Sequence, residues 1–140
     1  MKHLVTVFCI ACLSLFGKAF AQVSITATGG TLGPTTYTDL TTALTAINNG
    51  THTGSITVSV TASFSTATTA ILNASGSGSA SYTAVTIKPA ASVSPVITNT
   101  ADYTAAIKLN GADNVTIDGS NNGTTSQNLT FQNSNSGGSG

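Results

Sequence analysis

Charge is almost missing from this sequence of 140 residues. Only 6% of the residues are Asp, Glu, Lys or Arg, and the formal net charge at pH 7 is zero. Arginine, glutamate and tryptophan do not occur at all. So few lysines cannot neutralise the many phosphates that a nucleic-acid interface presents, and we therefore expect no nucleic-acid partner.

Cysteine is also scarce, since Cys9 and Cys12 near the N-terminus are the only two. The rest of the chain has no disulfide, and no thiolate that could act as a nucleophile or a metal ligand. A domain without such cross-links has to be held together by regular hydrogen bonding and by a packed core, which favours a repetitive fold. We expect no cofactor and no metal site.

The first residues have the three parts of a secretory signal peptide. A basic start precedes an apolar segment that ends at Phe16 and is too short to cross a bilayer, and Ala19 and Ala21 supply the small residues of a cleavage site. We predict cleavage after Ala21, so that a secreted or surface-exposed chain with no membrane span begins at Gln22. A lipid anchor on Cys12 is less favoured, because the residue three positions earlier is not the usual leucine.

One helix is expected in the exported part, at residues 39–48. Thr38 can cap its N-terminus, and Asn49-Gly50 can end it in a left-handed conformation. Before the helix, residues 22–28 predict a first strand and residues 29–36 a turn-rich connection. The apolar residues that fall on one face of the expected helix are Leu40, Ala43, Leu44 and Ile47.

Beyond the helix the pattern is that of short β-strands. Apolar and polar residues alternate from Ile56 to Val60, and we expect the alternation to continue to Phe64. Residues 74–81 are rich in Gly and Ser and predict a flexible loop. Later apolar pairs should each point into a shared core, and they are Val85/Ile87, Val96/Ile97, Ile107/Leu109, Val115/Ile117 and Leu129/Phe131.

These pairs follow one another too closely for each to begin a new coil of a solenoid, so we assign about three strands to each coil. The sequence thus predicts an all-β fold, a right-handed parallel β-helix fragment with a short N-terminal capping helix. An antiparallel sandwich is the main structural alternative, because its short strands have similar spacing. A disordered chain is less favoured, because Val, Ile and Leu recur at strand spacing and the net charge is not high.

Three segments carry a resemblance to a known family. They are the helix and strand of residues 39–60, the run Val85–Ala90, and the run Ala106–Ser120 with the following Asn128–Asn133. Together they resemble secreted proteins of the pectin-lyase-like right-handed parallel β-helix superfamily, in particular large adhesin-type bacterial surface proteins that often carry a type IX sorting domain. We therefore expect a signal peptide at 1–21, a strand and turn at 22–36, β-helix coils at 37–133 and a Gly/Ser-rich, truncated end at 134–140.

Four residues are candidates for structural turns in such coils. Asn114 and Asn128 each precede a strand in matching sequence context, and Asp118-Gly119 follows one. Asn and Asp side chains can satisfy turn groups, and Asn tolerates left-handed backbone. The nearby Asp113 could join Asp118 in a calcium site, but no dense acidic loop is visible. His52 is expected to be a loop residue, because no carboxylate lies near it in the sequence.

These observations favour a non-catalytic role. We expect the N-terminal part of a secreted or cell-surface β-helix protein of the adhesin or matrix kind, in contact with glycans or other surface proteins. The alternative is a polysaccharide lyase or glycoside hydrolase whose catalytic coils lie beyond residue 140. A third hypothesis, ice or mineral binding by rows such as Thr26-Ala27-Thr28 and Thr66-Ala67-Thr68, ranks low because such rows do not recur at a fixed period.

Overall fold

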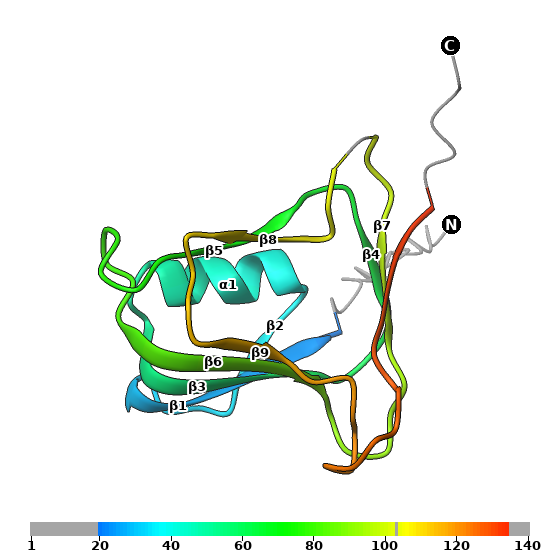
Figure 1. The fold of residues 1–140 in the computed structure, drawn as a ribbon, viewed down its shortest axis with the longest axis horizontal. Helices are drawn as coiled ribbons and strands as arrows, with labels where there is room; N and C mark the ends of the chain where they lie inside the picture. The colour runs from blue at the N-terminus through cyan, green and yellow to red at the C-terminus, as the bar shows by residue number, and fades with distance from the viewer. Residues whose placement is uncertain (1–19, 103, 135–140) are drawn as a thin grey trace, which may run out of the picture.

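The computed structural model describes residues 20–102 and 104–134, and within that range the chain is mostly β with one short helix (Figure 1). The predicted signal peptide and the Gly/Ser-rich end lie almost wholly outside the described residues. In chain order the elements are β1 (Val23–Gly30), β2 (Thr35–Tyr37), α1 (Leu40–Asn48), β3 (His52–Val60), β4 (Phe64–Thr66), β5 (Ala70–Asn73), β6 (Tyr82–Pro89), β7 (Val96–Asn99), β8 (Ile107–Asn110), β9 (Val115–Ile117) and β10 (Thr130–Asn133).

The strands form three open sheets. Sheet A has the order β2-β1-β3-β6-β9, sheet B the order β10-β7-β4, and sheet C consists of β5 and β8. β1 pairs antiparallel with β2 and with β3, whereas β3, β6 and β9 pair parallel, as do all the strands of sheets B and C. An antiparallel sandwich lacks this parallel pairing, so that alternative does not describe the strands from β3 onward.

Successive stretches of chain contribute one strand to each sheet in the same order. β3 lies in sheet A, β4 in sheet B and β5 in sheet C. β6, β7 and β8 visit the three sheets in the same order, each beside the earlier strand of its sheet. β9 and β10 then add to sheets A and B. Because of this register, side chains that point to the same face of a sheet lie above one another. Apolar residues therefore form columns, and Val58, Ile87 and Ile117 form one across sheet A.

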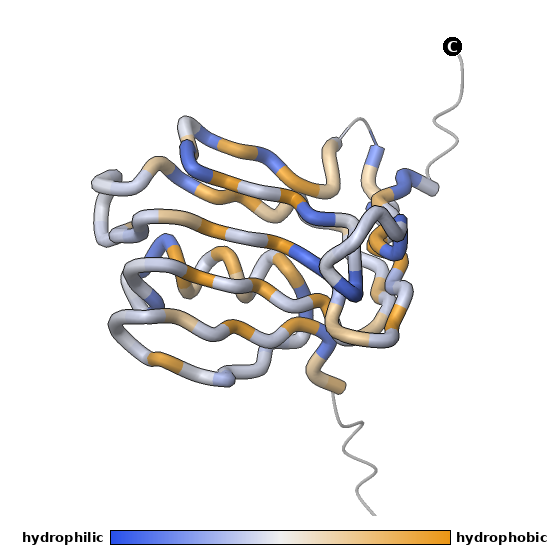
Figure 2. Tube along the Cα trace, turned by 60° about the horizontal axis from the view of Figure 1, so that its bottom comes forward, coloured by the Kyte–Doolittle hydropathy of each residue, from blue (hydrophilic) through white to orange (hydrophobic). Residues whose placement is uncertain are grey.

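The core lies between the three sheets and is covered at one end by α1. Inward residues of β3 and β6 alternate with outward polar ones, which Figure 2 shows as alternating hydropathy along the stacked segments. The helix buries the four residues predicted for its apolar face, Leu40, Ala43, Leu44 and Ile47.

The ends of α1 differ in part from the sequence-based expectation. Asp39, not Thr38, is the N-cap: its backbone is extended and its carboxylate accepts a hydrogen bond from the Thr42 N–H at 2.8 Å. Asn49 is the C-cap with an ordinary negative φ, and Gly50 takes the left-handed conformation at φ +73°. A side chain at Gly50 would also approach the Ser79 carbonyl oxygen to 2.6 Å.

Three strand predictions were wrong or incomplete. The expected turn at residues 29–36 contains the start of β2, which pairs with β1 around a tight connection. The alternation does not continue to Phe64 in one strand, because β3 ends at Val60 and Phe64 begins β4 in another sheet. β5 was missed altogether, since Ala70–Asn73 offers only two inward apolar residues after a threonine-rich stretch.

The last strands bury their inward side chains only partly. Leu109 and Ile117 are each 45% exposed, although their partners Leu72 and Ile87 are fully buried. β8, β9 and β10 lie at the edges of their sheets, so these side chains have packing neighbours on one side only. The expectation that every apolar pair enters a buried core therefore holds for Val85 and Ile87 but not for this end of the stack. It was also wrong for Val96, since of that pair in β7 only Ile97 is buried.

The column of Val58, Ile87 and Ile117 gives a direct test of this packing. Replacing Ile87 by Ala should lower the free energy of unfolding by about 2–5 kcal/mol, because a filled interior position becomes a cavity. Ile117→Ala removes the same atoms from a half-exposed position and should cost less than about 1.5 kcal/mol. Urea unfolding of both variants measures the difference, and equal losses would contradict the layered core.

Candidate functional site

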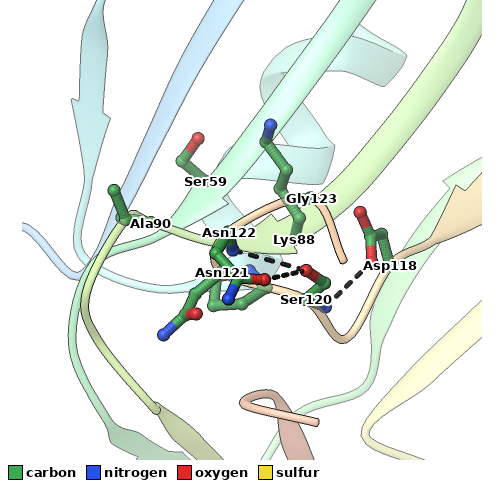
Figure 3. Close-up of a pocket in the computed structure, with 10 residues that line it drawn as sticks. Ser59, Lys88, Ala90, Asp118, Ser120, Asn121, Asn122 and Gly123 are labelled. Atoms are coloured by element: carbon green, nitrogen blue, oxygen red, sulfur yellow. Dashed lines mark hydrogen bonds between the residues drawn. The ribbon is translucent and has the colours of Figure 1, made fainter. Parts of the chain in front are cut away.

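A hollow lined by polar residues lies at one end of sheet A, on its outer face (Figure 3). Its volume is about 490 Å³. Ser59 comes from β3, Lys88 from β6, and the remaining polar residues from the loop between β9 and β10. The lining residues are Ser59, Lys88, Pro89, Ala90, Ala91, Asp118, Ser120, Asn121, Asn122 and Gly123.

Hydrogen bonds within the β9–β10 loop hold its polar side chains in place. The Asp118 carboxylate accepts a hydrogen bond from the Ser120 N–H at 2.8 Å, and the Ser120 hydroxyl donates to the Asn122 side-chain oxygen at 3.0 Å. The Asn121 amide donates to the Val93 carbonyl at 2.8 Å and so fixes the loop to the connection before β7. Ser120 is 3% exposed, which makes it part of the loop's interior.

The register of sheet A brings Lys88 and Asp118 to the same hollow. Ile87 pairs with Ile117, and the next residue of each strand is the charged one. One ammonium and one carboxylate, surrounded by hydroxyls and amides, can bind a polar group that offers both donors and acceptors. A single carboxylate does not supply the pair of acids that glycoside hydrolysis uses. The described residues contain no cluster of three or more His, Cys, Asp or Glu that could hold a metal ion.

The predicted turn residues lie around this loop and the start of β9. Asn114 directly precedes β9 in a left-handed conformation with φ +53°, and its carbonyl accepts from the Val85 N–H. The Asn128 N–H donates to the Gly119 carbonyl at 2.7 Å across the base of the loop, and its side chain reaches Ser94 at 3.0 Å. Gly119 does not have a positive φ, and a Cβ there would meet nothing within 4 Å.

A side-chain contact between asparagines does occur, but at positions that the sequence analysis missed. The Asn110 amide donates to the Asn73 side-chain oxygen at 3.0 Å, and these residues end the paired strands β8 and β5. Asn48, at the end of α1, continues the series by accepting from the Asn73 N–H at 2.9 Å and donating to the Ile71 carbonyl. The repeated Leu-Asn at the end of both strands was the available signal.

His52 is not the loop residue that we expected. It begins β3 and is fully buried, with Nδ1 2.6 Å from the Thr31 carbonyl oxygen and Nε2 2.7 Å from the Tyr37 hydroxyl. Because a carbonyl only accepts, Nδ1 donates the hydrogen bond to Thr31, and Nε2 forms the second hydrogen bond with the Tyr37 hydroxyl. The ring therefore ties β2 and the β1–β2 connection to β3, which is a structural role.

No protein-family model, no curated protein and no solved structure matches this chain. Among the described residues, no helix has the length and apolar character needed to cross a membrane. The site has therefore to be interpreted from its own geometry and chemistry.

Two tyrosines, Tyr37 and Tyr82, predict loss of stability at alkaline pH. Burial raises the pKa of Tyr37 above 10.0, and burial, helped by the charge of Asp113, does the same for Tyr82 against a smaller opposing effect of a hydrogen bond at Ser75. The folded state holds these protons more tightly than the unfolded state. The stability they contribute is present below pH about 10 and is lost as the pH rises through the folded pKa values.

The measurement is the free energy of urea unfolding between about pH 8 and about pH 11. The double variant Tyr37→Phe/Tyr82→Phe should lose stability less steeply over this range, even though it starts from a lower value because two hydrogen bonds are missing. If the free energy of unfolding falls equally steeply with pH in the natural chain and in the double variant, ionisation of Tyr37 and Tyr82 does not cause the loss of stability.

Proposed function

We propose that the described residues are the first coils of a right-handed parallel β-helix. The support is the repeated order of sheets A, B and C along the chain and the parallel pairing within each sheet. Connections between parallel strands are right-handed in almost all proteins, which gives the hand. α1 covers the end at which β3, β4 and β5 lie, as a capping helix would.

On this basis we propose a non-catalytic role as the N-terminal part of a secreted or cell-surface β-helix protein, similar to the adhesin-type members of the pectin-lyase-like superfamily. The observation that carries the proposal is the contrast between the two ends of the stack. One end is covered by α1, while Leu109 and Ile117 at the other are half exposed on unpaired edge strands. Further coils would cover these side chains and pair these edges.

Export by the signal peptide is part of the proposal. The Gln22 N–H donates to the Tyr37 carbonyl at 2.9 Å, and the Gln22 carbonyl accepts from the Thr61 N–H at 2.8 Å. The hydrogen-bonded ladder thus begins at the residue that cleavage after Ala21 would leave first. Removal of the preceding residues keeps both bonds and loses the one that the Thr61 hydroxyl donates to the Ala21 carbonyl at 3.2 Å.

Cleavage can be tested by expressing the full chain in a bacterium with a secretion pathway and sequencing the N-terminus of the exported product. We expect Gln22 as the first residue. Ala21→Pro should abolish processing, because the cleavage site requires a small residue there, whereas the conservative Ala21→Ser should be processed normally. An exported product that keeps Met1, or one lipidated at Cys12, would contradict the proposal.

Contact with glycans is the proposed use of the hollow that contains Lys88 and Asp118. Its hydroxyls, amides and single charges can form hydrogen bonds with sugar hydroxyls, and the shallow site predicts weak binding. On a glycan array, the full chain should bind a subset of glycans, and the double variant Lys88→Ala/Asp118→Asn should lose most of that signal. Ser65→Ala, on the outer face of sheet B, is the matched control and should bind like the natural chain.

The lyase or hydrolase alternative is separated by an activity assay of the same preparation. Incubation with acidic polysaccharides should yield no unsaturated products and no new reducing ends. Turnover that disappears in the Lys88→Ala/Asp118→Asn variant would contradict the non-catalytic assignment. If the chain binds none of the glycans tested, the proposal that the hollow contacts glycans is wrong. The β-helix assignment does not depend on this result.

A further inference from the structure

Four threonines form a straight row across the outer face of sheet A. Thr26 pairs with Thr57, Thr57 with Thr86, and Thr86 with Thr116, so β1, β3, β6 and β9 each contribute one residue. Their neighbours Val58 and Ile87 are fully buried, which places the threonines on the opposite, outward side. We call these four residues the threonine row.

The hydroxyls of the threonine row form no hydrogen bond with any other residue that the structure describes, unlike many hydroxyls elsewhere on this chain. Thr66 and Thr68, for example, bond to each other at 2.9 Å. Threonine also has a stiff χ1, so each hydroxyl and methyl group is held in one or a few orientations. The row is therefore a preformed array of free donors and acceptors.

A second row runs beside the first. Ser24 pairs with Ser59, and Ser59 with Lys88, each two residues from a member of the threonine row. Neighbouring strands are about 4.8 Å apart and alternate residues along a strand about 6.7 Å apart, so the hydroxyls form a nearly rectangular net. The second row ends in two charged residues, because Asp118, two residues beyond Thr116, lies next to Lys88.

We propose that this face binds the surface of ice. Ice presents oxygen atoms in a regular, uncharged net, and the regularly spaced, uncharged hydroxyl and methyl groups of the threonine row can order water in a similar arrangement. The outward residues of the described strands β1, β3, β6 and β9 include no aromatic side chain on which a sugar ring could stack. The earlier candidate pair Thr66 and Thr68 does not belong to the face, because Thr66 pairs with Asn99 in sheet B.

The inference is independent of the glycan proposal, and one substitution separates the two. Lys88→Thr removes a charge from the glycan hollow but extends the second row of hydroxyls. It should weaken glycan binding and strengthen ice binding. Thr86→Tyr places a bulky ring in the middle of the threonine row and should reduce ice binding, while Ser65→Tyr places the same ring on sheet B and serves as the control.

The experiment measures ice recrystallisation inhibition and the shape of single ice crystals in solutions of the full chain and the three variants. The natural chain should inhibit growth and facet the crystals. Thr86→Tyr should require about tenfold more protein, the loss expected from one or two hydrogen bonds, and Ser65→Tyr should behave like the natural chain. Circular dichroism and thermal unfolding verify that all variants are folded.

Two outcomes would overturn the inference. One is unshaped, freely growing ice with the natural chain and with Lys88→Thr. The other is ice activity that Thr86→Tyr leaves unchanged, which would place the activity elsewhere on the molecule. Binding to insoluble chitin or cellulose that is lost in Thr86→Tyr, without ice activity, would assign the face to a solid polysaccharide and not to ice.

Discussion

Parallel backbone pairing in a constant register is the constraint on which the rest of the structure depends. From Ser55 onward the register between β3, β6 and β9 does not shift. Side chains that point to the same face of the sheet therefore lie above one another. Inside the sheets this alignment produces apolar columns such as Val58, Ile87 and Ile117. Outside, the same alignment produces the threonine row and brings Lys88 next to Asp118. Core, hollow and outer face are thus three consequences of one ladder.

The alternation of side chains was enough to predict the long strands. β3 from Ile56 to Val60 and β6 from Val85 to Pro89 have strict period-two patterns, and α1 has an apolar face that the helical period identifies. The apolar pairs also predicted the short strands β7 to β10, but not β5 or β2. β5 has only two inward residues, and β2 follows a segment rich in glycine that looks like a turn. Their conformation depends on partners in other layers, which a local pattern does not contain.

The candidate site was less predictable than the fold. Asp118 was predicted to be a turn residue, and Lys88 lies in the run Val85–Ala90 that carried the resemblance, but only the register shows that they share a hollow. His52 was misjudged because its partners, Thr31 and Tyr37, come from the β1–β2 segment and are brought to it by antiparallel pairing. The threonine row was overlooked for the same reason, since its members are unevenly spaced in the sequence and aligned only after folding.

The parallel register can be measured directly with pairs of introduced cysteines, because no cysteine lies beyond Cys12. Partners in register lie about 4.8 Å apart, within the range that a disulfide can bridge. The account predicts that Thr57→Cys with Thr86→Cys and Ser59→Cys with Lys88→Cys both form a disulfide on mild oxidation, whereas Ser59→Cys with Ala84→Cys does not. If the strands were antiparallel, the disulfide would form between Ser59→Cys and Ala84→Cys and not between Ser59→Cys and Lys88→Cys. That result would contradict parallel pairing.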